Sequence, residues 1–258
     1  MDILSSIADG ILTLEFNRPE RKNAITNAMY QELADQINAA ADNKAVRALL
    51  IQGKETVFTA GNDLEDFMKG ASDLSTPLTE RPVYQFMQAL FQCEKPVVAA
   101  VAGNAVGIGT TLLLHCDLVY LADNAKLSVP FAQLGLCPEY ASSLLLPLYS
   151  GHARAAEKLM LGEPFGAEEA YAMGLASKVV PLAELHSHAR AQAAKLVGLP
   201  AASLRATKQL MKRASVPQIQ AALDIETPQF GKMLLGAEAR EAFTAFFQKR
   251  KPDFSQFD

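Results

Sequence analysis

The sequence contains no tryptophan and only three cysteines among its 258 residues. The cysteines, Cys93, Cys116 and Cys137, are odd in number and match no zinc-binding spacing. This pattern argues against both a disulfide framework and a structural zinc site. We therefore expect three buried or unreactive thiols and no bound metal.

Long apolar runs and a strong charge of either sign are also absent. No run reaches the roughly 18 apolar residues that a membrane-spanning helix requires, and residues 1–10 lack the basic and apolar regions of a secretory signal. The formal net charge is −4, which excludes an overall basic surface for nucleic acid. Half of the residues are hydrophobic and 20% are charged, an ordinary globular balance. We expect a cytoplasmic protein with no membrane span and no nucleic-acid partner.

The stretch from Val97 to Asp117, VVAAVAGNAVGIGTTLLLHCD, has the most informative pattern in the chain. Its first five residues are apolar and rich in valine, which predicts a buried strand. Glycines follow at positions 103, 107 and 109, and then Thr110 and Thr111 open a predicted helix. A strand, a glycine turn and a helix leave backbone N–H groups free at the positive end of the helix dipole. This arrangement predicts an anion site.

The rest of the chain alternates short strands with helices, which predicts an α/β fold. We expect further strands at 10–16, 48–52, 118–121, 126–129 and 176–180, and helices after Thr26 and at 83–93, 151–162 and 167–173. Serine, proline and charged residues at 69–82 predict a mobile loop. Beyond residue 181 only helices are predicted, at 182–197, 201–214, 217–234 and 236–249. The chain thus divides into a mixed α/β core, 1–197, and a helical region, 198–258.

A second turn with small residues, FTAGNDL at 58–64, also leads from a strand toward a helix. Together with the turn at Ile108, it can present one backbone N–H from each side to the same oxygen atom. Paired N–H donors of this kind stabilise an oxyanion. Glycine turns also serve close packing alone, and the spacing does not separate the two interpretations.

The segment NRPERKNAIT at 17–26 is a predicted loop with Arg18, Arg21 and Lys22 as its cations. These charges are typical of a solvated loop, and they equally fit a contact with phosphate groups.

These three segments, with VYLADNAKLSVPF at 119–131, resemble the crotonase, or enoyl-CoA hydratase/isomerase, superfamily. The resemblance runs from about Ile11 to the C-terminus. It implies a crotonase-like spiral of ββα units, a C-terminal helical trimerisation region and an acyl-CoA thioester as the ligand. The family's pattern assigns the two oxyanion amides to Asn62 and Ile108. The family usually has glycine at the second position, so the Ile108 side chain is expected to narrow the pocket.

Two carboxylates that hydratase relatives use are absent. The family pattern assigns them to the positions of Thr111 and Phe131, and neither residue can replace a glutamate. Adding water across a double bond is easiest with two carboxylates, one that activates water and one that handles the α-proton. The sequence therefore argues against ordinary hydration, and Phe131 predicts an apolar wall.

One glutamate remains in the right region, Glu139 in the segment PEYASS. Its apolar surroundings predict burial, which would raise its pKa and suit it to proton transfer near neutral pH. A glutamate here also fits the first turn of a helix, where acidic residues are favoured. The segment is similar to that of the peroxisomal-type Δ3,Δ2-enoyl-CoA isomerases, and this resemblance implies that Glu139 is the proton-transfer residue.

The remaining predicted contacts surround this centre. We expect the CoA and acyl groups to be bound by Arg21, Lys22, Ala24, Ala60, Asp63, Leu64, Gly107, Phe131, Tyr140 and Lys249, the last reaching a neighbouring subunit's CoA. His115 is interpreted as a buried, hydrogen-bonded residue, although a catalytic role is the alternative. His186 and His188 lie on different helix faces, so a shared metal is not expected.

The leading hypothesis is an enoyl-CoA isomerase that converts a 3-enoyl-CoA to a 2-trans-enoyl-CoA with Glu139 as the single base. It needs no cofactor, because coenzyme A is part of the substrate, and the resemblance implies a homotrimer or a dimer of trimers. The alternatives are an enoyl-CoA hydratase or another crotonase-type enzyme, with Glu139 or Asp63 as its acid/base group, and a non-catalytic acyl-CoA-binding module.

Overall fold

The computed structural model describes residues 1–72 and 76–257. Its larger sheet has six strands in the order β1 (Ile3–Ala8), β2 (Ile11–Phe16), β3 (Ala48–Gln52), β5 (Val97–Val101), β7 (Leu118–Ala122) and β10 (Lys178–Val180). Only β1 and β2 pair antiparallel, and all later neighbours are parallel. The edge strand β1 was not predicted from the sequence, because it has one buried residue, Ile3, and no alternating pattern.

A smaller sheet contains β4 (Val57–Thr59), β6 (Asn104–Val106), β8 (Lys126–Ser128) and β9 (Phe165–Gly166). Successive strands of the chain alternate between the two sheets, since β3, β5 and β7 belong to the larger sheet and β4, β6 and β8 to the smaller. The chain therefore winds as a spiral of ββα units, which confirms the predicted fold class.

Eleven helices accompany the sheets in the described part of the chain. The first eight are α1 (Asn27–Asp42), α2 (Leu64–Ser72), α3 (Pro82–Gln92), α4 (Ile108–Thr111), α5 (Ser142–Ser150), α6 (His152–Ala156), α7 (Ala167–Ala172) and α8 (Leu185–Val197). The C-terminal helices are α9 (Ala201–Lys212), α10 (Val216–Leu234) and α11 (Ala237–Phe247). Short 3-10 segments cover Pro19–Arg21, Leu78–Glu80, Leu112–His115, Ala132–Leu134 and Leu182–Glu184, and Glu157–Leu161 forms a π-helical turn.

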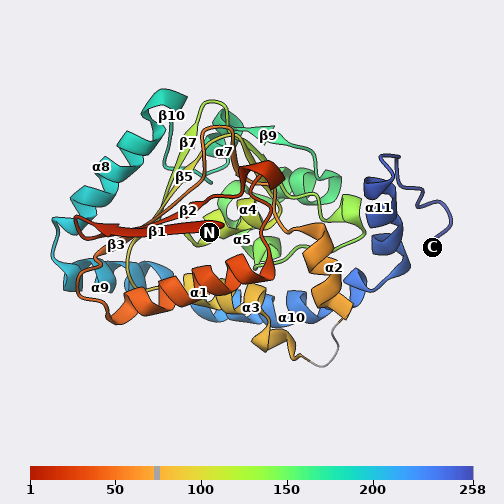
Figure 1. The fold of residues 1–258 in the computed structure, drawn as a ribbon, viewed down its shortest axis with the longest axis horizontal. Coiled ribbons are helices and arrows are strands. Elements are labelled where there is room, and N and C mark those ends of the chain that lie inside the picture. Colours follow the sequence, from red (N-terminus) through yellow and green to blue (C-terminus); the bar gives the residue numbers. More distant parts are fainter. Residues whose placement is uncertain (73–75, 258) are drawn as a thin grey trace.

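Two hydrophobic cores enclose the larger sheet. Residues of β3 and β5 alternate between them, with Leu49 and Val97 in the main core and Leu50 and Val98 in the smaller one. The main core lies against α1 and α3, and the smaller one against α8. Figure 1 shows α8 above the sheet and α1 and α3 below it. Burial on both faces explains why these strands read as continuous apolar runs.

Two predictions of local structure were wrong. Part of the loop predicted at 69–82 is helix, because α2 extends to Ser72, after Asp63 accepts a hydrogen bond from the Asp66 amide at its start. A 3-10 turn follows at Leu78–Glu80, and residues 73–75 lie outside the described residues. The helix predicted to open on Thr110 and Thr111 begins at Ile108 and becomes a 3-10 helix after one turn.

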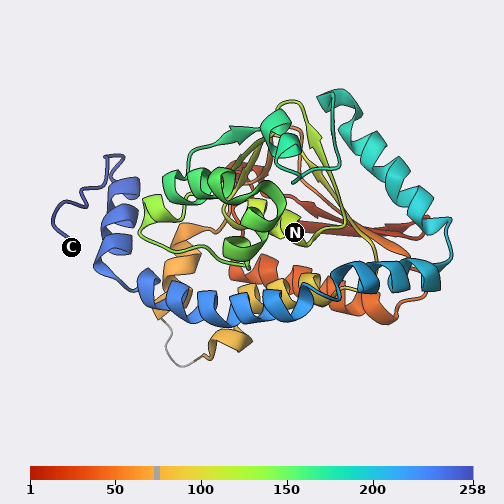
Figure 2. The same cartoon turned by 180° about the vertical axis from the view of Figure 1, so that it is seen from behind.

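The C-terminal helices pack on the core through α10, which contacts α5, and through α9. Lys208 of α9 forms an ion pair with Asp117 at 2.6 Å and donates to the Lys95 carbonyl oxygen. In Figure 2, α10 runs along the lower edge of the molecule, and α11 and the C-terminus lie at one end. Nothing in this packing tests the predicted division at residue 198. Within residues 1–72 and 76–257, no helix is both long and apolar enough to cross a membrane.

Candidate active site

Two turns leave the same edge of the smaller sheet. Strands β4 and β6 are parallel neighbours, and Thr59 pairs with Ala105. Asn62 follows Thr59 by three residues, and Ile108 follows Ala105 by three residues. Because both turns begin at paired positions of parallel strands, the sheet brings the two predicted amide donors together.

Glycines allow these turns to touch. A Cβ atom on Gly61 would lie 2.7 Å from the Val106 carbonyl oxygen, and one on Gly109 would lie 2.5 Å from the Thr59 side chain. Gly61 also has φ +85°, a conformation that only glycine adopts readily. A Cβ atom on Gly107 would meet nothing within 4 Å, so this backbone faces open space. Gly61 and Gly109 serve close packing, and Gly107 leaves space in front of the turn. The glycines therefore fit both a packing role and an oxyanion site.

The two amides have no acceptor of their own. The Ile25 N–H donates to the Gly61 oxygen and the Asp63 N–H donates to the Ile25 oxygen, which leaves the intervening Asn62 N–H free among the described residues. The Ile108 N–H stands at the first position of α4, where a helix supplies no acceptor, and no other described group accepts from it. The Ile108 side chain packs into the main core. Two free N–H groups at adjacent turns can bind one carbonyl oxygen.

Glu139 lies in the loop that enters α5, beside α4. The Thr111 hydroxyl donates to its Oε1 at 2.5 Å, so Thr111 links the helix that carries the Ile108 amide to this carboxyl group. Glu139 is half-buried as a residue, but its carboxyl group is largely withdrawn from water. Burial, assisted by the charge of Glu226, raises the pKa of Glu139 to about 8 against the opposing hydrogen bond from Thr111. A carboxyl group with this pKa exchanges protons readily near neutral pH.

Tyr30 of α1 joins the amide turn to this glutamate. Its hydroxyl donates to Asn62 Oδ1 at 2.6 Å and so orients the turn. Burial raises the pKa of Tyr30 well above its usual range, and the nearby negative charge of Glu139 adds to the rise. Sequence reasoning missed Tyr30, because it shares the buried face of α1 with Leu33 and Ile37 and is typical of a core residue there.

Phe131 is almost fully buried and lies against Phe230 of α10, with ring centroids 6.4 Å apart. Phe230 also contacts Phe67 of α2 at 6.1 Å. The predicted apolar wall at Phe131 is therefore part of an aromatic cluster that three separate elements build. The Phe230 contribution could not be found from the sequence, because it depends on how α10 packs.

The residues predicted to contact CoA come together around the first turn. The Ala60 N–H donates to the Lys22 oxygen at 3.0 Å, and buried Asn23 donates to the Val57 and Phe58 oxygens. These bonds place the loop with Arg21, Lys22 and Ala24 beside the segment with Ala60, Asp63 and Leu64. The side chains of Arg21 and Lys22 are exposed. Lys249 is exposed at the end of α11, and its predicted contact with a neighbouring subunit stays a prediction.

Asp63 is engaged by Arg18. Arg18 Nη1 lies 2.7 Å from Asp63 Oδ2 and also donates to the Ala24 oxygen, so Arg18 is not free to bind phosphate. Partial burial favours a higher pKa for Asp63, but the Arg18 guanidinium and the Asp66 amide hold its pKa below the usual value. Asp63 therefore stays ionised and paired, which makes it a poor acid/base group.

Tyr140 and His115 stand behind the Glu139 loop. Their rings stack at 3.8 Å, and His115 Nε2 lies 2.9 Å from the Tyr140 carbonyl oxygen. Burial lowers the pKa of His115 to about 3, so the ring is neutral and donates this hydrogen bond. The Tyr140 hydroxyl donates to the Met87 oxygen, and the residue is 0% exposed. The ring has no accessible surface, and the expected contact between Tyr140 and the acyl chain stays a prediction.

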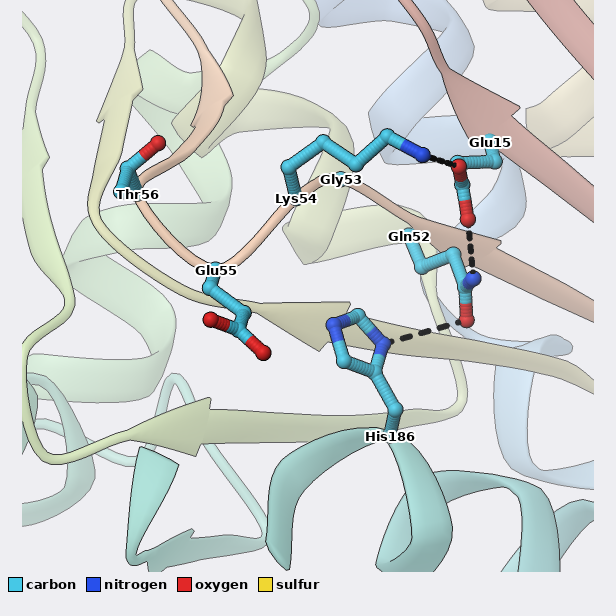
Figure 3. Close-up of a pocket in the computed structure, with 7 residues that line it drawn as sticks. All are labelled: Glu15, Gln52, Gly53, Lys54, Glu55, Thr56 and His186. Carbon is cyan, nitrogen blue, oxygen red and sulfur yellow. Dashed lines mark hydrogen bonds and ion pairs between the residues drawn. The ribbon is translucent and has the colours of Figure 1, made fainter. Parts of the chain in front are cut away.

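A cavity of about 420 Å³ lies elsewhere, between the ends of β2 and β3 and the start of α8 (Figure 3). Four of its polar side chains, Glu15, Gln52, Lys54 and His186, bind one another. Lys54 and Gln52 both donate to Glu15, and His186 Nδ1 lies 3.3 Å from Gln52 Oε1. Since these four side chains are already paired, whereas Asn62 and Ile108 offer free amides, we place the candidate active site at Asn62, Ile108 and Glu139.

Metal-ligating groups do not gather in the part of the chain that the structure describes, where no three His, Cys, Asp or Glu side chains form a cluster. The three cysteines are free and half-buried. The prediction allowed either buried or unreactive thiols, and none of the three is fully buried. Burial raises the pKa of Cys116 to about 12 and also raises the pKa of Cys93 and Cys137, so all three thiols are unreactive near neutral pH.

The paired amides and the Glu139 carboxyl group on this ββα spiral form an arrangement that can bind a carbonyl oxygen and exchange a proton. A sequence model of the enoyl-CoA hydratase/isomerase family matches residues 6–257. The chain is 35% identical over 250 residues to a probable enoyl-CoA hydratase of Rhodobacter capsulatus, which covers 96% of each chain. It is 33% identical over 253 residues to enoyl-CoA delta isomerase 2 of Rattus norvegicus, covering 97% of this chain and 64% of that one.

A crystal structure of an enoyl-CoA hydratase/isomerase from Pseudoalteromonas atlantica superimposes with a TM-score of 0.92 at 37% identity, and the match covers 99% of this chain and 100% of that one. The chain therefore belongs to the enoyl-CoA hydratase/isomerase family, within the crotonase superfamily. It is an enzyme of that family, whose activities are hydration and isomerisation of acyl-CoA substrates.

Proposed function

We propose that the protein is an enoyl-CoA isomerase that converts a 3-enoyl-CoA to a 2-trans-enoyl-CoA. The supporting observation is the single carboxyl group, Glu139, bound by Thr111 on the helix that begins with the Ile108 amide. A pKa of about 8 suits this group to accept a proton and return it in the same turnover.

In the proposed reaction the thioester oxygen accepts hydrogen bonds from the Asn62 and Ile108 amides. Ionised Glu139 removes a proton from C2, and the electron pair moves into a dienolate whose negative charge the two amides stabilise. Protonated Glu139 then returns the proton to C4, while the double bond moves from C3–C4 to C2–C3. One base serves both steps because C2 and C4 lie on one face of a planar dienolate. No cofactor enters the reaction.

Hydration is the weaker proposal for this site. Thr111 and Phe131 occupy the two positions where hydratase relatives carry glutamate, and Asp63 is paired with Arg18. The aromatic cluster of Phe67, Phe131 and Phe230 offers no polar group to hold an attacking water. A non-catalytic binding module is disfavoured because a buried glutamate with a raised pKa serves no purpose in binding an apolar chain.

The proposal extends to the ligand and the assembly. Exposed Arg21 and Lys22 are positioned to bind the CoA phosphates, and the C-terminal helices are proposed to form a homotrimer, in which Lys249 reaches a neighbour's CoA. We place the enzyme in the cytoplasm, in the oxidation of unsaturated fatty acids or related acids.

The test compares the Glu139→Gln variant with the wild type on 3-enoyl-CoA and 2-enoyl-CoA, following formation of the conjugated product and consumption of the 2-enoyl compound. We expect the variant to lose about 10³-fold in kcat on 3-enoyl-CoA, since general acid–base groups contribute roughly this much. Glu163→Gln, an exposed glutamate in a loop, is the matched control and should keep full activity. Full isomerase activity in Glu139→Gln, or hydration of 2-enoyl-CoA as the faster wild-type reaction, would overturn the proposal.

A further inference from the structure

The backbone after Glu139 is held in an unfavourable conformation. Tyr140 and Ala141 both have φ +57°, and neither is glycine. A non-glycine residue in the left-handed region costs roughly 1–2 kcal/mol, so two in succession persist only when the surroundings enforce them. This double turn aims the Glu139 side chain toward Thr111, and whatever holds the turn also positions Glu139.

The group that holds it is a carboxylate from the C-terminal helices. Glu226 of α10 accepts from the Ala141 N–H through Oε2 at 2.6 Å and from the Ser143 N–H through Oε1 at 3.0 Å. The Ser143 hydroxyl donates to the same Oε1. Glu226 thereby serves as the missing N-terminal cap of α5, whose own cap residue, Ala141, has no side-chain acceptor.

Burial raises the pKa of Glu226, whereas the hydrogen bonds that it accepts from Ser143 and Ala141 act to lower it and so favour the ionised form. Both backbone amides are obligatory donors, so both carboxylate oxygens must accept. Glu226 is 6% exposed, and its partners among the described residues are donors of this turn with no cation among them. Burying an anion without a counter-ion is costly. A residue that served packing alone at this position would not need to be a carboxylate.

A second contact ties the same helix face to the site. Phe230 lies one turn after Glu226 on α10 and packs against Phe131 and Phe67. The α10 helix therefore contributes one residue behind the proton-transfer group and one to the aromatic wall.

We infer that Glu226 is a positioning residue for Glu139, which acts by holding the Tyr140–Ala141 turn through the Ala141 and Ser143 amides. The inference rests on the proposed role of Glu139. It also means that α10, which the sequence assigns to an oligomerisation region, is part of the active site of its own chain.

The experiment measures kcat, KM and the pH profile of 3-enoyl-CoA isomerisation for Glu226→Gln, with Asp224→Asn as control. Asp224 is an exposed acid on the same helix, so its replacement removes an equal charge away from the turn. A glutamine offers one oxygen and turns its NH₂ group toward a donor, so the turn loses one amide contact. We expect kcat to fall about 10²-fold, as a shift of about 1 Å at a catalytic group would cause, while KM changes little.

The pH profile separates positioning from simple loss of folding. The groups that face Glu139 are Thr111, Tyr30, Tyr140, Cys137 and Glu226, and of these Glu226 is the one whose charge raises the pKa of Glu139. Its negative charge raises the pKa of Glu139, so removing it should move the acid limb of kcat/KM to lower pH. A variant with unchanged kcat, or with reduced kcat and an unmoved acid limb, would overturn the inference.

Hydrogen exchange on the substrate-free protein tests the turn independently of activity. In Glu226→Gln we expect faster exchange of the Ala141 and Ser143 amides, with the exchange of β5 amides unchanged, whereas Asp224→Asn should exchange like the wild type. Unchanged exchange at Ala141 and Ser143 would contradict the inference. If the wild type showed no isomerase activity but the exchange result held, the proposed function would fail and Glu226 would still be assigned to the turn.

Discussion

At the scale of single residues, the environment of Glu139 opposes its ionisation in two ways and favours it in one. Withdrawal from water and the charge of Glu226 raise its pKa, while the Thr111 hydrogen bond lowers it. The three effects together leave the group titrating at about pH 8, so both its forms are accessible in a proton shuttle. The Thr111 and Glu226 effects come from two different elements, α4 and α10, and each can be removed by one substitution.

Replacing Thr111 with valine removes the one favourable contact without a large change in volume. The pKa of Glu139 should then rise above its value of about 8, because the hydrogen bond stabilises the ionised form. Since the base form is required, the acid limb of the kcat/KM profile should move to higher pH, opposite to the change in Glu226→Gln. Measured pH profiles of both variants check this, and a Thr111→Val limb at lower pH would contradict the assignment.

At the scale of elements, the site depends on the contact between the β4–α2 and β6–α4 turns. Gly61→Ala places a Cβ atom 2.7 Å from the Val106 oxygen at a residue with φ +85°. We expect the two turns to separate, with a loss of stability of at least about 1 kcal/mol from the strained backbone and a fall in kcat as the Asn62 amide shifts.

The matched control for this change is Gly166→Ala, because that glycine has an extended backbone and a Cβ atom there would meet nothing within 4 Å. Urea unfolding and steady-state kinetics on both variants check the result. Equal stability and activity of Gly61→Ala and the wild type would show that the turns do not need their close approach.

At the scale of the whole molecule, the raised pKa of Glu139 makes folding stability depend on pH. In the unfolded chain this group titrates near 4.5, and in the folded protein at about 8. Between these values the folded state binds more protons than the unfolded state, so the contribution of Glu139 to the free energy of unfolding falls as pH rises from about 4.5 to 8. Above pH 8 the folded protein carries the full cost of a buried, ionised carboxylate.

Glu139→Gln should therefore unfold at a higher urea concentration than the wild type at pH 9, which is about one unit above the folded pKa of Glu139. The difference should shrink toward pH 5, where the folded protein already holds the proton. Unfolding curves at several pH values measure this. A difference that stays constant with pH would show that Glu139 titrates at an ordinary value.

Most strands of the larger sheet, most helices and the pair of glycine turns were predictable because their signals are local, whereas β1, β6 and β9 were not predicted. Valine-rich runs, glycines at 61, 107 and 109 and the Thr26 cap, which accepts from the Met29 amide, all act within a few residues. The family resemblance added Glu139, Asn62 and Ile108 as a set. The end of α2, residues 69–72, was predicted as loop because its composition favours a loop, whereas the packing of the helix, with Phe67 against Phe230, favours a longer helix.

The sequence by itself determined the alternation of strands and helices, and its family resemblance added the loss of both hydratase carboxylates and the retention of one glutamate, since these depend on residue identity and short-range pattern. Only the tertiary structure decided how that glutamate is held. Tyr30, Arg18 and Glu226 act on the site across 32, 45 and 85 residues of chain, through bonds to Asn62, Asp63 and Ala141. A hydrogen bond between residues so far apart leaves no mark on the local pattern, because folding alone brings its donor and acceptor together.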